Sequence, residues 1–119
     1  MNTELSPSQQ QRLRRYEQEY RELKKKLVEV GFILQGSLAK RWMRCGKANC
    51  ACQQDEKARH GPYYQWSWKE KGRTASVYLN QQQAELCQAW IANQREMERV
   101  MSRMRTLSLR IARLYGMGQ

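Results

Sequence analysis

The sequence predicts an α+β chain in which two long helices flank a three-stranded antiparallel β-meander. Apolar residues recur at heptad spacing near the start, alternate with polar ones in the middle, and form a long helical stripe near the end. We expect an N-terminal helix in residues 1–30, a β module with a Cys/His loop in 31–80, and a C-terminal helix in 81–119. The two helices are expected to pack as an antiparallel coiled coil.

The N-terminal helix has a capping sequence at its start. Ser6 is the expected N-cap, Pro7 the first helical residue, and Gln9 the partner that completes a capping box. Gly31 is expected just after its end. The predicted seam consists of apolar residues spaced three and four apart, namely Leu13, Tyr16, Tyr20, Leu23, Leu27 and Val30.

Alternation in the middle segment predicts strands. It places Tyr64, Trp66 and Trp68 on one face of a strand, and we expect the two tryptophans to be part of a hydrophobic core. Lys71-Gly72 is typical of a turn, so the last two strands should form a hairpin. The expected strands are residues 37–44, 63–69 and 73–79.

Asn80 is the expected cap of the second helix, with Gln83 in its capping box and an end near Tyr115. Beyond about Met104 its apolar stripe has no predicted partner within the chain. Exposed stripes usually mark interfaces, so we expect a homodimer or a partner protein there. The stripe comprises Ala84, Cys87, Trp90, Ile91, Met97, Val100, Met101, Met104, Leu107, Ile111 and Leu114.

The charge is strongly positive and unevenly distributed. The chain has 22 Lys+Arg against 11 Asp+Glu, a net charge of +11. Residues 31–80 have nine basic and three acidic groups, whereas residues 1–30 have a net charge of only +2. Such an excess favours a nucleic acid partner, although basic residues can also merely solubilise a surface. The candidate nucleic-acid contacts are Lys40, Arg41, Arg44, Lys47, Lys57, Arg59, Lys69, Lys71 and Arg73.

A cluster of possible metal ligands lies in the β module. Cys45, Cys50, Cys52 and His60 follow the spacing C-x4-C-x-C-x7-H. Zinc prefers four tetrahedral thiolate and imidazole ligands, and a complete set leaves no position open for catalysis. We therefore expect structural zinc; the alternative is a metal-free loop whose cysteines pack as small apolar residues. Cys87 lies on the helical stripe and is expected in the core.

The middle segment resembles a family of small bacterial proteins of unknown function. The resemblance covers about residues 36–80 and implies similarly placed flanking helices, but no activity. It rests on Gly36-Ser-Leu, Arg44-Cys-Gly-Lys-x-x-Cys-x-Cys, His60-Gly-Pro-Tyr-Tyr, Trp68-x-x-x-Gly72 and Tyr78-Leu79. More weakly, two strands joined by a Lys-Gly-Arg turn and followed by a helix resemble the arm-type DNA-binding domains of integrases, whose sheet enters the major groove. This second resemblance favours DNA over RNA as the partner.

Together these features predict a small basic DNA-binding accessory protein with structural zinc. The alternative is a coiled-coil adaptor, or an accessory subunit of a larger nucleic-acid-processing complex, with a methionine-rich contact stripe. We expect no enzyme and no small-molecule substrate, because there is one histidine and neither a phosphate-binding loop nor a nucleophile elbow. The polar N-terminus and the lack of a long apolar run predict a cytoplasmic protein that does not enter a membrane.

Overall fold

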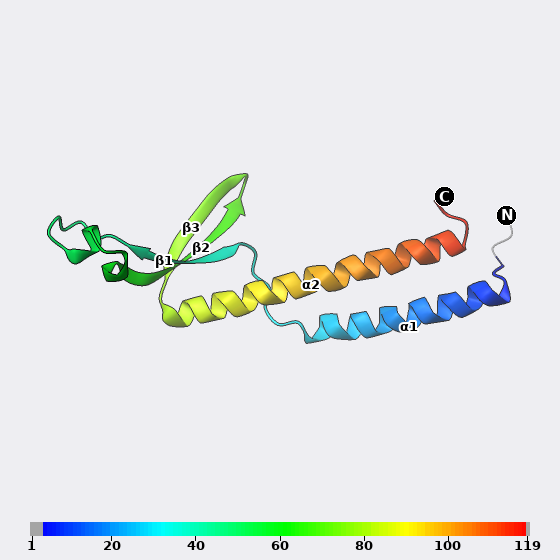
Figure 1. The fold of residues 1–119 in the computed structure, drawn as a ribbon. Helices are drawn as coiled ribbons and strands as arrows, with labels where there is room; N and C mark the ends of the chain where they lie inside the picture. Colours follow the sequence, from blue (N-terminus) through cyan, green and yellow to red (C-terminus); the bar gives the residue numbers. More distant parts are fainter. Residues whose placement is uncertain (1–3, 119) are drawn as a thin grey trace. The chain divides into compact units, whose positions relative to one another are not determined.

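The computed structural model describes residues 4–118. These residues form two α-helices, two short 3-10 helices and a three-stranded antiparallel sheet, so the fold class is α+β (Figure 1). No helix within this part of the chain combines the length and apolar character that a membrane crossing requires. The order is α1 (Pro7–Glu29), β1 (Ser37–Met43), η1 (Ala51–Gln53), η2 (Glu56–Ala58), β2 (His60–Glu70), β3 (Arg73–Leu79) and α2 (Gln81–Leu114).

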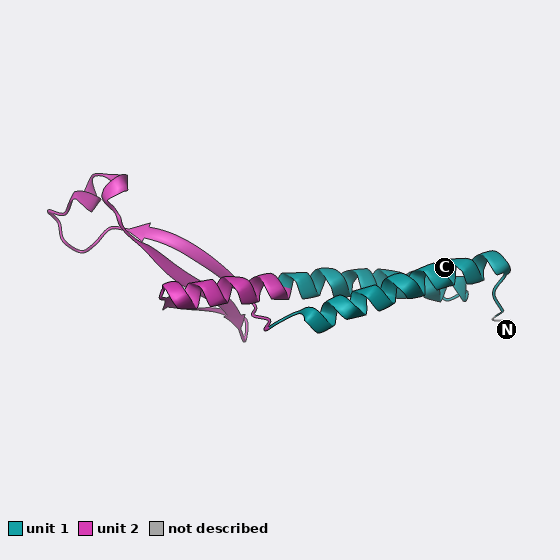
Figure 2. Ribbon diagram, turned by 90° about the horizontal axis from the view of Figure 1, so that it is seen from below, with its two compact units in different colours: residues 1–31, 95–119 teal, residues 32–94 magenta. Residues whose placement is uncertain are grey.

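The chain divides into two compact units, shown in different colours in Figure 2. One contains α1 and the part of α2 from Arg95 onward. The other spans Phe32–Gln94 and contains the whole sheet with the first part of α2. The long helix α2 therefore contributes residues to both units.

Both predicted capping boxes are confirmed. At the start of α1, Ser6 Oγ accepts from the Gln9 N–H at 3.2 Å, and Gln9 Oε1 accepts from the Ser6 N–H at 2.8 Å. Asn80 and Gln83 make the same reciprocal pair at the start of α2, at 2.8 and 2.9 Å. These bonds satisfy backbone N–H groups that have no partner inside a helix, which fixes where each helix begins.

The buried core of the first unit lies between α1 and the later part of α2, where no intrachain partner was predicted. Leu23, Val100 and Leu107 are buried together, and Leu107 has 0% of its surface exposed. The prediction that the stripe of α2 lacks an intrachain partner beyond Met104 is wrong, because the seam of α1 packs there. The physical reason is that α1 packs against the part of α2 that includes Val100, Met104 and Leu107. The residues packed around the buried cluster are Tyr16, Tyr20, Leu27 and Met104.

In the second unit, the segment that precedes β1 runs along α2. The Leu34 N–H donates to the Trp90 carbonyl at 3.1 Å, and Asn93 Nδ2 donates to the Phe32 carbonyl at 2.8 Å. The Phe32 and Trp90 rings meet edge to face, 5.4 Å between centroids. Gly36 then enters β1 with a positive φ of 111°. A Cβ at Gly36 would lie 2.2 Å from the Ser67 carbonyl oxygen, so only glycine fits at this approach.

The expectation of a tryptophan core in the sheet is also wrong. Trp66 and Trp68 are half-buried and stack on each other, 4.0 Å between centroids. None of the described strand residues is buried. The buried residues of this unit are instead Ala84, Cys87 and Ile91 on α2, and Cys52 in the loop. The reason is that a small three-stranded sheet, with its exposed edges, leaves both of its faces partly in solvent.

Candidate metal centre

Strand pairing brings the two ends of the β1–β2 loop together. The strands lie in the order β1-β2-β3, and Met43 near the end of β1 pairs with His60 at the start of β2. Cys45 follows Met43 by two residues. Strand β2 therefore begins three residues earlier than predicted, through an irregular register between Arg41 and Met43. Gly61 makes this possible, because its φ is +141° and a Cβ there would lie 2.7 Å from the Arg41 carbonyl oxygen.

The other two cysteines come from the short helix η1. Cys50 is its N-cap residue and Cys52 lies within it, with 1% of its surface exposed. Gln53 Nε2 donates to the carbonyl of Cys45 at 2.6 Å and to that of Lys47 at 3.2 Å, which closes the loop on itself. The sequence analysis did not identify this role of Gln53, because a glutamine in a loop has no periodic neighbours that would reveal it.

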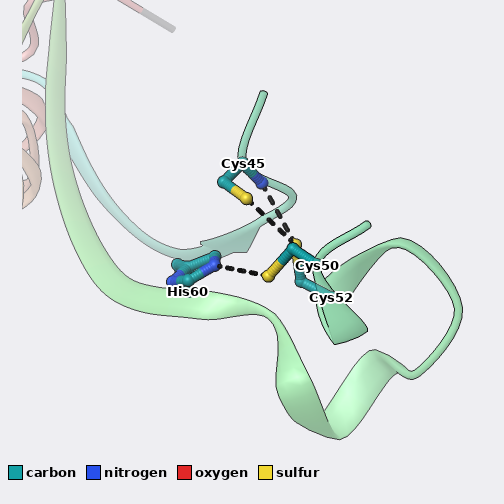
Figure 3. Close-up of side chains that lie close together, drawn as sticks. All are labelled: Cys45, Cys50, Cys52 and His60. Carbon is teal, nitrogen blue, oxygen red and sulfur yellow. Dashed lines mark hydrogen bonds between the residues drawn. The ribbon is translucent and has the colours of Figure 1, made fainter. Parts of the chain in front are cut away.

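The four predicted ligands are brought together. The ligand atoms of Cys45, Cys50, Cys52 and His60 all lie within 4.8 Å of one another and could hold a metal ion (Figure 3). Cys45 Sγ lies 3.5 Å from Cys52 Sγ. Cys50 Sγ lies 3.4 Å from His60 Nε2. A tetrahedral site with metal–sulfur bonds of about 2.3 Å and metal–nitrogen bonds of about 2.0 Å has edges of roughly 3.5–3.8 Å, so these spacings suit such a site.

The surroundings of Cys50 and Cys52 shift the pKa values of these two thiols in opposite directions. The backbone N–H of Cys52, with His60 and the neighbouring thiols, lowers the pKa of Cys50 to about 6. The Cys45 N–H donates to Cys52 Sγ at 3.3 Å and favours the thiolate there. Desolvation and the two neighbouring thiols outweigh that bond and raise the pKa of Cys52. The thiolate is the form that binds metal, so Cys50 is more readily ionised to the binding form than Cys52.

Cys87 is separate from this cluster, as predicted. It lies on the buried face of α2 with 3% of its surface exposed, and burial raises its pKa. An inert buried thiol of this kind is a packing residue.

The nine predicted nucleic-acid contacts do not form one continuous surface. Pairing places Lys40 and Arg73 on one face of the sheet, and Arg41 and Lys69 on the other. Most of the nine gather at the two ends of β2, which are roughly 30 Å apart at the usual rise per residue. The loop group comprises Arg44, Lys47, Lys57 and Arg59, and the hairpin group comprises Lys69, Lys71 and Arg73.

Few of these cations are neutralised. Arg59 lies 3.8 Å from the carboxylate of Glu56. Among residues 4–118, no carboxylate pairs with any of the other eight. Lys40 lies over the Trp42 ring, 5.3 Å from its centroid, and Lys69 donates to the Thr74 hydroxyl at 2.9 Å. The sheet and its loop therefore present a positive charge that the described residues leave largely uncompensated.

Comparison with known families gives a match over residues 9–89, to a family described as "Domain of unknown function (DUF6788)". The chain belongs to the DUF6788 family. The match covers most of α1, the whole sheet with its Cys/His loop, and the start of α2, so the metal cluster lies inside the DUF6788 domain. The expected membership of a family of unknown function is confirmed. No curated protein and no solved structure matches the chain, and the resemblance to integrase arm domains stays a prediction.

Proposed function

We propose that this DUF6788 protein is a small, non-catalytic, nucleic-acid-binding accessory protein, with DNA as the expected class. The observation that carries this proposal is the charge of the sheet and its loop. Residues 37–79 contain nine Lys and Arg against three Asp and Glu, and eight of the nine cations have no carboxylate partner among the described residues. A phosphate backbone neutralises such a surface and releases its own counterions on binding.

We propose zinc as the metal of the Cys/His cluster. Three thiols and one imidazole are a donor set that zinc prefers, and their spacing suits tetrahedral edges. Four protein ligands leave no coordination position for a substrate, which makes the site structural. Cys52 is the only buried residue in the described loop 44–59, so this loop has almost no apolar core of its own. The metal would therefore fix the loop, and with it the cations of the loop group.

Metal analysis tests the zinc proposal. Protein purified without chelator should contain about one zinc per chain, measured by plasma mass spectrometry. Cys52→Ser should lose the metal and lower the thermal stability of the β module, because metal binding and folding of such a site are coupled. Cys87→Ser is the matched control, since Cys87 is also buried but lies outside the cluster. Equal zinc content in Cys52→Ser and wild type would contradict the proposal.

A salt series tests nucleic acid binding. Duplex DNA is titrated at several salt concentrations, and log affinity is plotted against log salt concentration. Each neutralised phosphate contributes about −0.9 to that slope. Replacing all three residues of the hairpin group by alanine should weaken binding and flatten the slope by roughly 2–3 units.

A variant of α1 provides the control for that titration. Lys24, Lys25 and Lys26 are exposed, and their replacement by alanine removes the same number of charges outside the sheet. This variant should bind nearly as wild type does. A larger loss in the α1 variant than in the hairpin variant would show that the footprint is wrong. Wild-type protein that binds neither DNA nor RNA at low salt would refute the proposed function.

A protein-interaction adaptor is the second candidate, and apolar exposure favours it. In the second unit, Phe32 and Leu86 have 75% and 45% of their surfaces exposed. Large apolar residues left in solvent are typical of contact surfaces when they lie close together. If the salt series shows no nucleic acid binding, this adaptor function is the one to pursue.

A further inference from the structure

The two faces of the sheet differ in their chemistry. Directly opposed residues of antiparallel strands share a face, so the register assigns each side chain to one side. We call one side the tyrosine face; it has Arg41, Tyr63, Gln65, Lys69, Ser76 and Tyr78. The strand positions of the tyrosine face include two cations and no acidic residue. Glu70, the only acidic residue in the strands, lies opposite Arg73 in the strand register, on the other face of the sheet.

The aromatic rings on the two faces also differ in how far they are free to contact a ligand. On the opposite face, Trp66 and Trp68 stack on each other with their planes 23° apart, and Trp66 Nε1 donates to the Gln35 carbonyl at 2.9 Å. Their rings are thus engaged within the chain. On the tyrosine face, Tyr63 and Tyr78 have 41% and 54% of their surfaces exposed. The two tyrosine rings meet edge to face, with 6.5 Å between their centroids. This arrangement leaves ring surface open to solvent.

Exposed aromatic rings close to cations suit one form of nucleic acid. In a duplex the base faces are covered by their neighbours in the stack, whereas a single strand can place its bases on aromatic side chains. Arg41 lies opposite Tyr63, and Lys69 is six residues farther along β2, about 20 Å at the strand rise. Arg41 is thus level with Tyr63 on the neighbouring strand β1, and Lys69 lies beyond the position of Tyr78, so a backbone running along this face would pass both cations.

We propose that the tyrosine face binds single-stranded DNA, with bases stacked on Tyr63 and Tyr78 and phosphates held by Arg41 and Lys69. This inference rests on the proposed nucleic-acid-binding function and specifies its substrate as unpaired strand instead of duplex. Trp42 of β1 is also exposed, but Lys40 lies over its ring, 5.3 Å from the centroid.

The test compares fluorescence anisotropy titrations with labelled oligothymidylate and with a blunt-ended duplex of the same length. Wild type should bind the single strand more tightly. Tyr63→Ala combined with Tyr78→Ala should weaken single-strand binding by about tenfold or more, since stacking contributes substantially for each base. Tyr63→Phe combined with Tyr78→Phe retains both rings and should restore most of that affinity.

Tyr115→Ala removes a tyrosine of similar exposure, 40%, that lies outside the sheet, and should bind as wild type does. Binding that prefers the duplex and is unchanged in the double alanine variant would overturn the inference while the nucleic-acid-binding function stands. No binding to either probe would instead refute that function. A tyrosine-dependent preference for oligouridylate over oligothymidylate would overturn the assignment to DNA.

Discussion

Replacing Leu107 by alanine tests whether α1 truly covers the later part of α2. Leu107 has 0% of its surface exposed and lies in a cluster with Leu23 and Val100. Truncating a fully buried leucine removes its transfer free energy and leaves a cavity, which together lower the free energy of unfolding by about 2–5 kcal/mol. That is a large fraction of the roughly 5–15 kcal/mol that holds a small domain folded.

The matched control is Leu109→Ala, two residues along the same helix, where 49% of the leucine surface is exposed. This change should alter the free energy of unfolding by no more than about 0.5 kcal/mol. The measurement is urea unfolding followed by circular dichroism at the helical minimum, with the two variants and wild type side by side. Both changes remove the same atoms from the same helix, so the difference between them reports burial alone.

Protein concentration decides between burial within the chain and burial at an interface. If Leu107 is covered by α1, the unfolding midpoint of each variant is independent of protein concentration. If it is covered by a second copy, stability rises with concentration because association is linked to folding. Equal stabilities for the Leu107 and Leu109 variants, or a midpoint that moves with concentration, would show that the intrachain packing is wrong.

Two further predictions concern single contacts. Arg103 donates to Glu19 and lowers the pKa of that carboxyl, so the pair stabilises the fold above about pH 4.5 and loses this effect as pH falls. Glu19→Gln should therefore reduce stability at neutral pH and match wild type in acid, measured by urea unfolding across pH. Gly36→Ala should lower the melting temperature because its Cβ would meet the Ser67 carbonyl, whereas Gly46→Ala, with open space around it, should not.

Local patterns predicted the elements of this fold well. Both capping boxes could be predicted because each hydrogen-bonded pair is only three residues apart in sequence. The pairs are Ser6 with Gln9 and Asn80 with Gln83. The Cys/His cluster could be predicted for a similar reason. Its four donors lie in or beside one loop, and the pairing of β1 with β2 brings the two ends of that loop together. Each prediction depends on contacts that are short in sequence or fixed by strand pairing.

What the sequence could not predict depends on contacts between distant segments. The seam of α1 and the stripe of α2 are both visible as patterns, but neither pattern specifies which turn of one helix faces which turn of the other. The stripe pattern therefore predicts that Leu107 contacts another chain, whereas Leu107 is buried in a cluster with Leu23 of α1. Alternation likewise separates Tyr63 from Trp66 without saying which face stays in solvent. The distant contact that distinguishes the faces is the hydrogen bond from Trp66 Nε1 to the Gln35 carbonyl, on the face opposite the tyrosines.

The four donors of the Cys/His cluster differ in their access to solvent. Cys52 is buried and Cys45 and Cys50 are half-buried, whereas His60 is exposed. If the cluster holds a metal ion, as proposed, the exposed imidazole of His60 would be the ligand that an incoming molecule can replace first. A chelator or a competing metal would thus approach along the start of β2, and the thiolates would be the last to leave. The same asymmetry shields Cys52 from oxidants, so damage to the cluster would begin at its half-buried sulfurs.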